Sequence, residues 1–174
     1  MHLRLLLLLL SVLILSLPAL AADGWENYSN PRFGFTAAVP PGFALTQESD
    51  NGDGATFRSQ DGRAEMLLFG ANIIEGNFSD EIRQRIGWDR QEGWTISYDK
   101  VTSNWASYSG TREADILYVR GIMLCDGSAG YFHLRYPQDM QTTIGPVISR
   151  MVKSLHPAGG CEQSPKAAPG AAQN

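Results

Sequence analysis

The sequence has little of the chemistry on which the common enzyme classes depend. Its 174 residues include three histidines and two cysteines, and they contain no phosphate-binding glycine loop, HExxH motif or dinucleotide fingerprint. The segment Gly127-Ser128-Ala129-Gly130 is not a nucleophile elbow, because it lacks the Gly-x-Ser-x-Gly spacing. These absences count against the commonest motif-bearing enzymes, but they do not exclude every enzyme.

Positive charge is also scarce and is not clustered. The chain has 14 Lys and Arg against 18 Asp and Glu, which gives a net charge of −4. A mildly acidic chain without a basic cluster indicates no nucleic-acid partner and no attachment to an anionic membrane surface. Cys125 and Cys161, combined with His133 or His156, match no zinc-binding spacing, so we expect no metal and no cofactor.

A long hydrophobic run occurs only at the N-terminus. Arg4 precedes the apolar stretch Leu5–Leu17, which is followed by Ala19-Leu20-Ala21, a small-x-small cleavage pattern. We therefore predict a signal peptide over residues 1–21, cut before Ala22, and a periplasmic or secreted protein with no membrane span after cleavage. The alternative is an uncleaved N-terminal anchor.

The rest of the chain suits one domain followed by a tail. Residues 22–156 are enough for a single α/β domain with a sizeable core. Residues 157–174 are rich in Pro, Gly and Ala and predict a flexible tail, ordered only near Cys161 if that thiol is bonded. Because an oxidising compartment favours pairing, we predict a disulfide between Cys125 and Cys161; two unpaired thiols are the alternative.

The stretch Ile116–Pro137 forms the centre of the predicted fold. It reads as two strands joined at Asp126-Gly127, a dipeptide typical of tight hairpin turns. The first strand is apolar on both faces, so it requires cover on both sides. Glu65–Ile74 is apolar on both faces as well, and we expect it to lie beside this hairpin.

Helices are expected where apolar residues recur every three or four positions. The first has its N-cap at Ser79 and ends near Gln91, and we interpret the charges of residues 80–90 as its solvated face. The second follows the apolar stripe Met140–Leu155 and ends at His156; Pro146 either kinks it or is the first residue of a helix that begins near Gly145. Residues 25–32 are expected to be a lead-in with turns. Further strands are predicted over residues 33–39, 43–46, 55–59, 94–100 and 105–111.

Two groups of residues are candidates for a binding surface. Tyr131, His133 and Arg135 share one face of their strand and could form a polar cluster or a pocket wall, although a histidine in such a strand is more often a structural hydrogen-bonding residue. The aromatic residues Trp94, Tyr98 and Trp105 could stack on sugar rings if they are exposed. Core or cross-strand packing is the other interpretation of these aromatic residues.

The order of these segments resembles the PsbP-like superfamily of small α/β/α sandwiches. The resemblance spans Tyr28–Leu155 and is carried by Arg-Phe-Gly-Phe-x-x-x-x-Pro at Arg32–Pro40, by Leu134-Arg135-Tyr136-Pro137, and by Lys153-Ser154-Leu155 at the end of the last helix. It implies an α+β fold with a central antiparallel sheet flanked by helices on both faces. Many members of this superfamily are non-enzymatic accessory or binding proteins, and no functional residue carries over from them.

These observations together predict an exported, non-catalytic binding or accessory module of the bacterial envelope. Its expected partner is an unknown envelope protein or a small ligand. Two alternatives stay open: a small periplasmic enzyme with a site around His133, and a carbohydrate- or envelope-binding module that uses exposed aromatic residues. A concave pocket around His133 would favour the enzyme, whereas coplanar exposed aromatic side chains would favour the carbohydrate-binding module.

Overall fold

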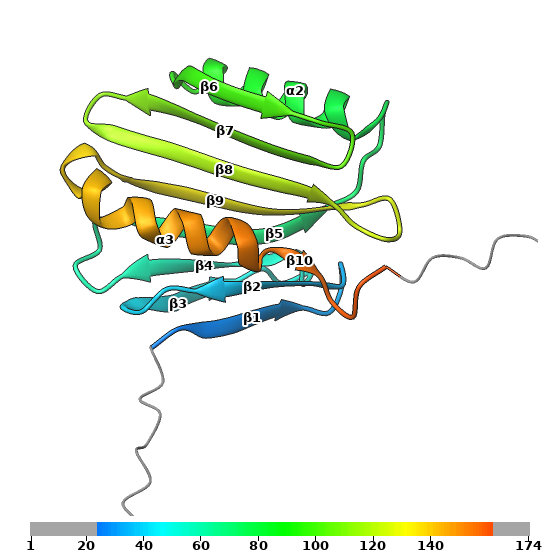
Figure 1. Cartoon of the computed structure of the whole chain (residues 1–174), viewed down its shortest axis with the longest axis horizontal. Helices are drawn as coiled ribbons and strands as arrows, with labels where there is room; N and C mark the ends of the chain where they lie inside the picture. The colour runs from blue at the N-terminus through cyan, green and yellow to red at the C-terminus, as the bar shows by residue number, and fades with distance from the viewer. Residues whose placement is uncertain (1–23, 162–174) are drawn as a thin grey trace, which may run out of the picture.

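The computed structural model describes residues 24–161, so the predicted signal peptide and the part of the predicted tail beyond Cys161 lie outside the described residues (Figure 1). No helix in this part of the chain is long and apolar enough to cross a membrane. In chain order the elements are β1 (Glu26–Asn30), β2 (Phe35–Val39), β3 (Phe43–Glu48), β4 (Gly54–Ser59), β5 (Glu65–Ala71), α2 (Phe78–Gln91), β6 (Thr95–Val101), β7 (Trp105–Arg112), β8 (Asp115–Met123), β9 (Ala129–Pro137), the 3-10 helix η1 (Gln138–Met140), α3 (Gln141–Ser154) and β10 (His156–Pro157).

Seven strands form one antiparallel sheet in the order β3-β4-β5-β9-β8-β7-β6. The predicted central hairpin is confirmed, because β8 and β9 pair from Asp115 opposite Pro137 to Met123 opposite Ala129. Gly127 in its turn has a φ of +85°, which glycine adopts without steric penalty. The predicted neighbour is confirmed as well, because β5 pairs with β9 along its whole length.

A second, three-stranded sheet with the order β1-β2-β10 is not among the predicted elements. The expected lead-in at residues 25–32 contains β1, and His156 lies in β10 opposite Thr36 instead of ending the last helix. Both β1 and β10 are short. Strand β1 forms a hairpin with β2, its neighbour in sequence, whereas β10 comes from the other end of the domain. Phe33 lies against Gly70 of β5, where a Cβ atom would have no room, and this contact seats the small sheet against the large one.

Helix α2 begins earlier than expected, whereas α3 begins next to Met140, the first residue of the predicted apolar stripe. The N-cap of α2 is Asn77 rather than Ser79: the Asn77 side chain accepts hydrogen bonds from the backbone N–H groups of Ser79 and Asp80. The Asp80 carboxylate in turn accepts from the Asn77 N–H, which completes a capping box. Helix α3 begins at Gln141, so the alternative start is wrong and Pro146 lies inside the helix.

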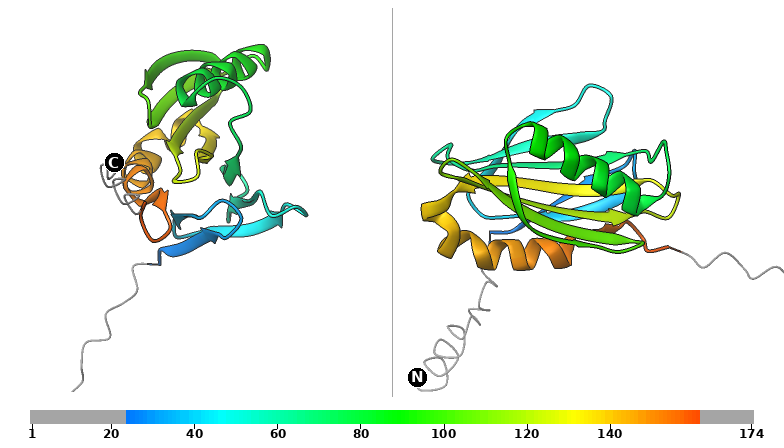
Figure 2. Two further views of the ribbon diagram at one scale, coloured as in Figure 1. Left: turned by 90° about the vertical axis from the view of Figure 1, so that its right-hand side faces the viewer. Right: turned by 90° about the horizontal axis from the view of Figure 1, so that it is seen from above.

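Buried apolar side chains form two separate cores, because alternate residues of a strand point to opposite faces of the sheet. On β9, Phe132 and Leu134 belong to the core that includes α3 and β2, which we call the α3-side core. Tyr131 belongs to the core that includes α2, which we call the α2-side core. The two helices lie at different places on the molecule (Figure 2), since α2 contacts β6 and β7 whereas α3 contacts β2.

This arrangement confirms the α+β class and the large antiparallel sheet. The finer expectation, that helices flank both faces of the large sheet, is not confirmed. The α3-side core is covered by α3 together with the three-stranded sheet, and not by a helix alone.

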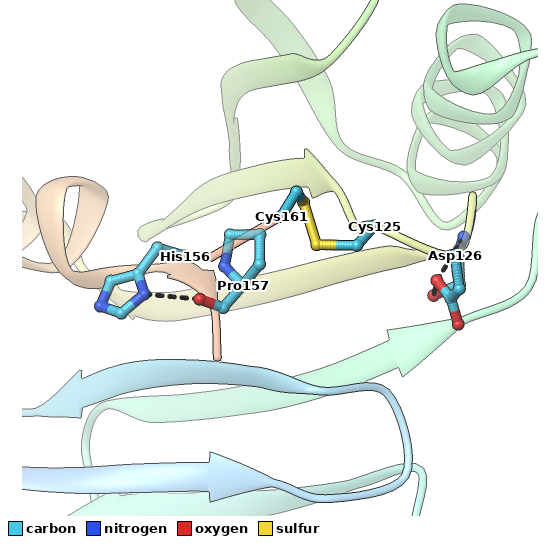
Figure 3. The surroundings of a disulfide bond; sticks show 6 residues. Cys125, Asp126, His156, Pro157 and Cys161 are labelled. Carbon is cyan, nitrogen blue, oxygen red and sulfur yellow. Dashed lines mark hydrogen bonds between the residues drawn. A yellow bond between two sulfur atoms is a disulfide. The ribbon is translucent and has the colours of Figure 1, made fainter. Parts of the chain in front are cut away.

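The predicted disulfide is present between Cys125, which follows β8, and Cys161, which follows β10 (Figure 3). The two Cα atoms are 5.2 Å apart, although 36 positions separate the residues in sequence. Strand β10 guides the chain to this point, and the N–H of Ala158 donates to the carbonyl of Gly34 at 2.8 Å. Residues 157–161 are thus tied to the domain, as expected for the part of the tail next to a bonded Cys161.

Candidate binding site beside helix α2

A groove runs between α2 and the strands β5 and β9. It consists of two adjoining cavities of about 520 and 270 Å³, both lined by Arg85 and Trp88 of α2. We call the two cavities together the α2-side groove. The larger cavity extends to Asp53 and the loop at residues 72–75, and the smaller one extends over Tyr131 and His133.

The register of the sheet places the strand residues of the groove. Leu67 of β5 lies opposite His133 of β9, and Phe69 lies opposite Tyr131. Residues directly opposite one another share a face of the sheet, and Tyr131 belongs to the α2-side core. These four side chains therefore face the helix.

The helix side of the groove follows from helical spacing. Glu81, Arg85 and Asp89 recur every four residues and so lie on one face of α2. Glu81 and Asp89 are buried, so the interpretation of all these charges as a solvated face is wrong for these two residues. A sequence signal for this burial exists: Glu81, Arg85 and Asp89 recur every four residues beside the apolar stripe of Ile82 and Ile86.

Arg85 is held at the junction of the two cavities. Its guanidinium forms an ion pair with Glu81 at 2.7 Å, and its side chain is only 18% exposed. The same guanidinium lies 4.3 Å from the ring centroid of Tyr131 and 5.4 Å from that of Phe69. The two rings stack on each other with centroids 5.0 Å apart. Ion pairing and cation–π attraction thus fix the position of this cation.

Asp89 joins the helix to the sheet. Its Oδ2 accepts a hydrogen bond from the Tyr108 hydroxyl at 2.7 Å. Its Oδ1 lies 3.9 Å from Nε2 of His133, which is too long for a hydrogen bond but close enough for charge attraction if the histidine is protonated. Burial raises the pKa of Tyr108, and the negative charge of Asp89 raises it further.

Tyr131 lines the smaller cavity, but its hydroxyl group is buried within the protein. The residue is fully buried, and the hydroxyl has no hydrogen-bond partner within residues 24–161. Burial raises the pKa of Tyr131 to about 12, against the opposing effect of the positive charge of Arg85. The hydroxyl therefore stays protonated at neutral pH.

The structure brings two of the three predicted strand residues into the groove. Tyr131 and His133 both line the smaller cavity. Arg135 does not line either cavity, because its guanidinium is paired with the Asp115 carboxylate at 3.0 Å. Tyr131 and His133 therefore lie together at this cavity, and the expected hydrogen bond of His133 is not found within the described residues. That these residues form a binding surface stays a prediction.

The three predicted aromatic residues do not form one exposed surface. Trp94 is only 4% exposed and packs in the α2-side core, so core packing is the interpretation that holds for it. A β-bulge between Ile96 and Tyr98 interrupts the alternation of side chains along β6. Tyr98, which is 47% exposed, therefore points to the face of the sheet opposite to that of Ile96. Trp105 shares that side, where Lys100 and Arg120 lie over its ring.

The groove offers charged, hydroxyl and aromatic groups, which suit recognition by charge, hydrogen bonding and apolar contact. Within the described part of the chain, no group of three or more His, Cys, Asp or Glu side chains is placed to hold a metal ion. The described residues that line the smaller cavity include no Ser, Cys or Lys side chain. For chemistry on a substrate, that lining provides His133 and Asp89 as candidate proton-transfer groups.

Comparison with known proteins shows what fold this is. No protein-family model and no curated protein matches the sequence. Among solved structures, the Synechocystis PsbP (CyanoP) is similar with a TM-score of 0.60 and 12% identity, over 80% of this chain and 95% of that one. The Ran-binding protein Mog1p of Saccharomyces cerevisiae is similar with a TM-score of 0.57 and 10% identity, over 78% of this chain and 96% of that one.

The chain has a PsbP-like fold. This finding confirms the resemblance drawn from the order of sequence segments. At such low identity the likeness concerns the arrangement of the backbone, and a fold shared by proteins of different function does not assign one. The function of this PsbP-like domain therefore has to be inferred from its own groove.

Proposed function

We propose that this protein is an exported, non-catalytic binding or accessory module of the bacterial envelope, with the α2-side groove as its binding surface. The observation that carries the proposal is the pair of adjoining cavities of about 520 and 270 Å³, with Trp88 46% exposed at their junction. A half-exposed tryptophan beside buried charges is typical of protein recognition surfaces. The proposal includes an α/β/α sandwich as the framework, with α2 and α3 on opposite faces of the large sheet.

Export is supported by the predicted signal peptide and by the disulfide, which is stable in an oxidising compartment. We expect protein purified from the envelope fraction to begin at Ala22. An intact-mass measurement tests this, and a mass that includes Met1 would contradict export by cleavage.

A photo-cross-linking experiment tests the groove. A photoreactive amino acid is placed at Gln84, which is exposed and lines the larger cavity, and in a control protein at Tyr98 on the opposite face. We expect an envelope protein to cross-link to position 84 and not to position 98, and the product to disappear when Trp88→Ala is added. Equal products from both positions, or none from position 84, would overturn the proposal.

The second candidate is a small enzyme, which is favoured by the position of His133 in a concave cavity 3.9 Å from Asp89. The two candidates differ in what His133→Gln changes. For a binding module we expect this substitution to lower the melting temperature more than it changes partner capture. Loss of a catalysed reaction with an unchanged melting temperature would instead establish the enzyme.

A further inference from the structure

The arginines of the α2-side groove are already neutralised. Arg32 forms an ion pair with Asp53 at 3.2 Å, at the open end of the larger cavity. Arg85 forms its ion pair with Glu81 at 2.7 Å. Neither guanidinium therefore contributes an uncompensated positive charge to the groove.

Three further carboxylates line the groove and have no Lys or Arg partner among the described residues: Glu75, Asp89 and Glu92. Asp89 accepts a hydrogen bond from the Tyr108 hydroxyl at 2.7 Å and lies 3.9 Å from Nε2 of His133, but it forms no ion pair with a Lys or Arg among the described residues. The groove as a whole therefore carries excess negative charge. Part of it lies in a buried setting, where charges are weakly screened.

Apolar surface adjoins these carboxylates. Ile74 is 88% exposed and Trp88 is 46% exposed, and both line the larger cavity. The fully buried Tyr131, whose hydroxyl has no partner within residues 24–161, lines the smaller cavity together with Asp89 and Glu92. An occupant of both cavities needs a cationic part and an apolar part.

We infer that the α2-side groove binds a segment of a protein partner in which a Lys or Arg side chain adjoins apolar side chains. The inference rests on the proposed function, which it makes more specific. The cation enters the smaller cavity near Asp89 and Glu92. The apolar side chains pack on Trp88 and Ile74. An acidic segment would instead face three uncompensated carboxylates.

Selection from a random octapeptide library displayed on phage tests this chemistry without assuming a sequence. The baits are the wild-type protein and the double variant Glu75→Gln/Glu92→Gln. The matched control is Glu26→Gln/Glu48→Gln, which makes the same change in net charge at exposed carboxylates on β1 and β3, outside both cavities. Lys or Arg next to apolar residues is expected to be enriched on wild type and on the control, and to lose this enrichment on the groove variant.

The enriched peptide is then measured by fluorescence anisotropy. We expect about tenfold weaker binding to the groove double variant, less than about twofold change for the control, and weaker binding at high salt for wild type. No enrichment, enrichment of acidic peptides, or equal binding to the groove variant would overturn the inference. If Trp88→Ala abolishes cross-linking of the natural partner while Glu75→Gln/Glu92→Gln does not, the inference falls and the proposed function stands.

Discussion

The two cores of this domain are built from different kinds of residue. The α3-side core consists of apolar side chains from both sheets and α3. The α2-side core is smaller, and the acidic side chains of Glu81 and Asp89 on α2 are buried next to it. Burying a charge costs stability unless it is well paired, and here Glu81 is paired with Arg85 at 2.7 Å and Asp89 accepts a hydrogen bond from Tyr108 at 2.7 Å. We propose from this difference that the α3 side maintains the fold and that the α2 side serves recognition.

Removing a large side chain from the α3-side core should have the largest effect on stability. Phe132 is fully buried and its ring stacks with Tyr118 at a centroid distance of 5.8 Å. Phe132→Ala removes this contact and leaves a cavity, so we expect the free energy of unfolding to fall by about 3–5 kcal/mol. Urea denaturation followed by tryptophan fluorescence measures it. A loss below about 1 kcal/mol would mean that this core is not the main source of stability.

Removing the disulfide on the α3 side should have the next largest effect on stability. Replacing both Cys125 and Cys161 by Ala opens a closed loop spanning 36 positions, for which the chain-entropy model gives a loss of about 4 kcal/mol. Denaturation of wild type with and without reductant, compared with the double variant, measures the loss. The unfolded, unreduced wild type should show no reactive thiol, and two reactive thiols per chain would refute the bridge.

Two tyrosines of the α2 side should respond differently to loss of the hydroxyl group. Tyr108 donates to Asp89 at 2.7 Å, so Tyr108→Phe leaves a buried carboxylate without that donor and should lower the free energy of unfolding by about 1–3 kcal/mol. The hydroxyl of Tyr131 has no partner among the described residues, so Tyr131→Phe should change stability by less than about 1 kcal/mol at pH 7. Equal losses would show that Tyr131 is also hydrogen-bonded.

The raised pKa of Tyr131 predicts how stability depends on alkaline pH. Burial raises this pKa from 10.0 to about 12. Between these values the unfolded state loses the proton while the folded state keeps it, so stability is complete below pH 10 and falls as the pH rises. The slope for this one group is about 1.4 kcal/mol per pH unit. Tyr131→Phe should remove that part of the slope, and unfolding measured between pH 9 and about 12 tests it.

The smallest effect on stability is expected at the exposed rim of the α2-side groove. Trp88 is 46% exposed, so Trp88→Ala should change the free energy of unfolding by less than about 1 kcal/mol while it abolishes partner binding. Tyr98→Ala is the control, because Tyr98 is 47% exposed and lies on the other face. Similar binding by the two variants would remove the functional distinction between the two sides.

Much of the fold could be predicted from local patterns in the sequence. The two-faced hairpin at β8 and β9, its neighbour β5 and the apolar stripes of both helices follow from periodicity, since a side chain's direction repeats every two residues in a strand and every 3.6 in a helix. The disulfide could be predicted because two cysteines in a chain predicted to be exported have only each other as partners. The face shared by Tyr131 and His133 likewise follows from alternation along one strand.

The rest depends on contacts between distant segments. The pairing of β10 with β2 joins segments that are far apart in sequence, and the separation of Tyr98 from Trp94 is decided by a bulge that no alternation pattern shows. The burial of Glu81 and Asp89 is decided by which face of α2 meets the sheet. From its sequence alone this protein determines most of its strands and both helices, because those depend on neighbouring residues, and its disulfide, because the sequence has only two cysteines. Its groove exists only in the tertiary structure, because burial and charge compensation depend on which segments pack together.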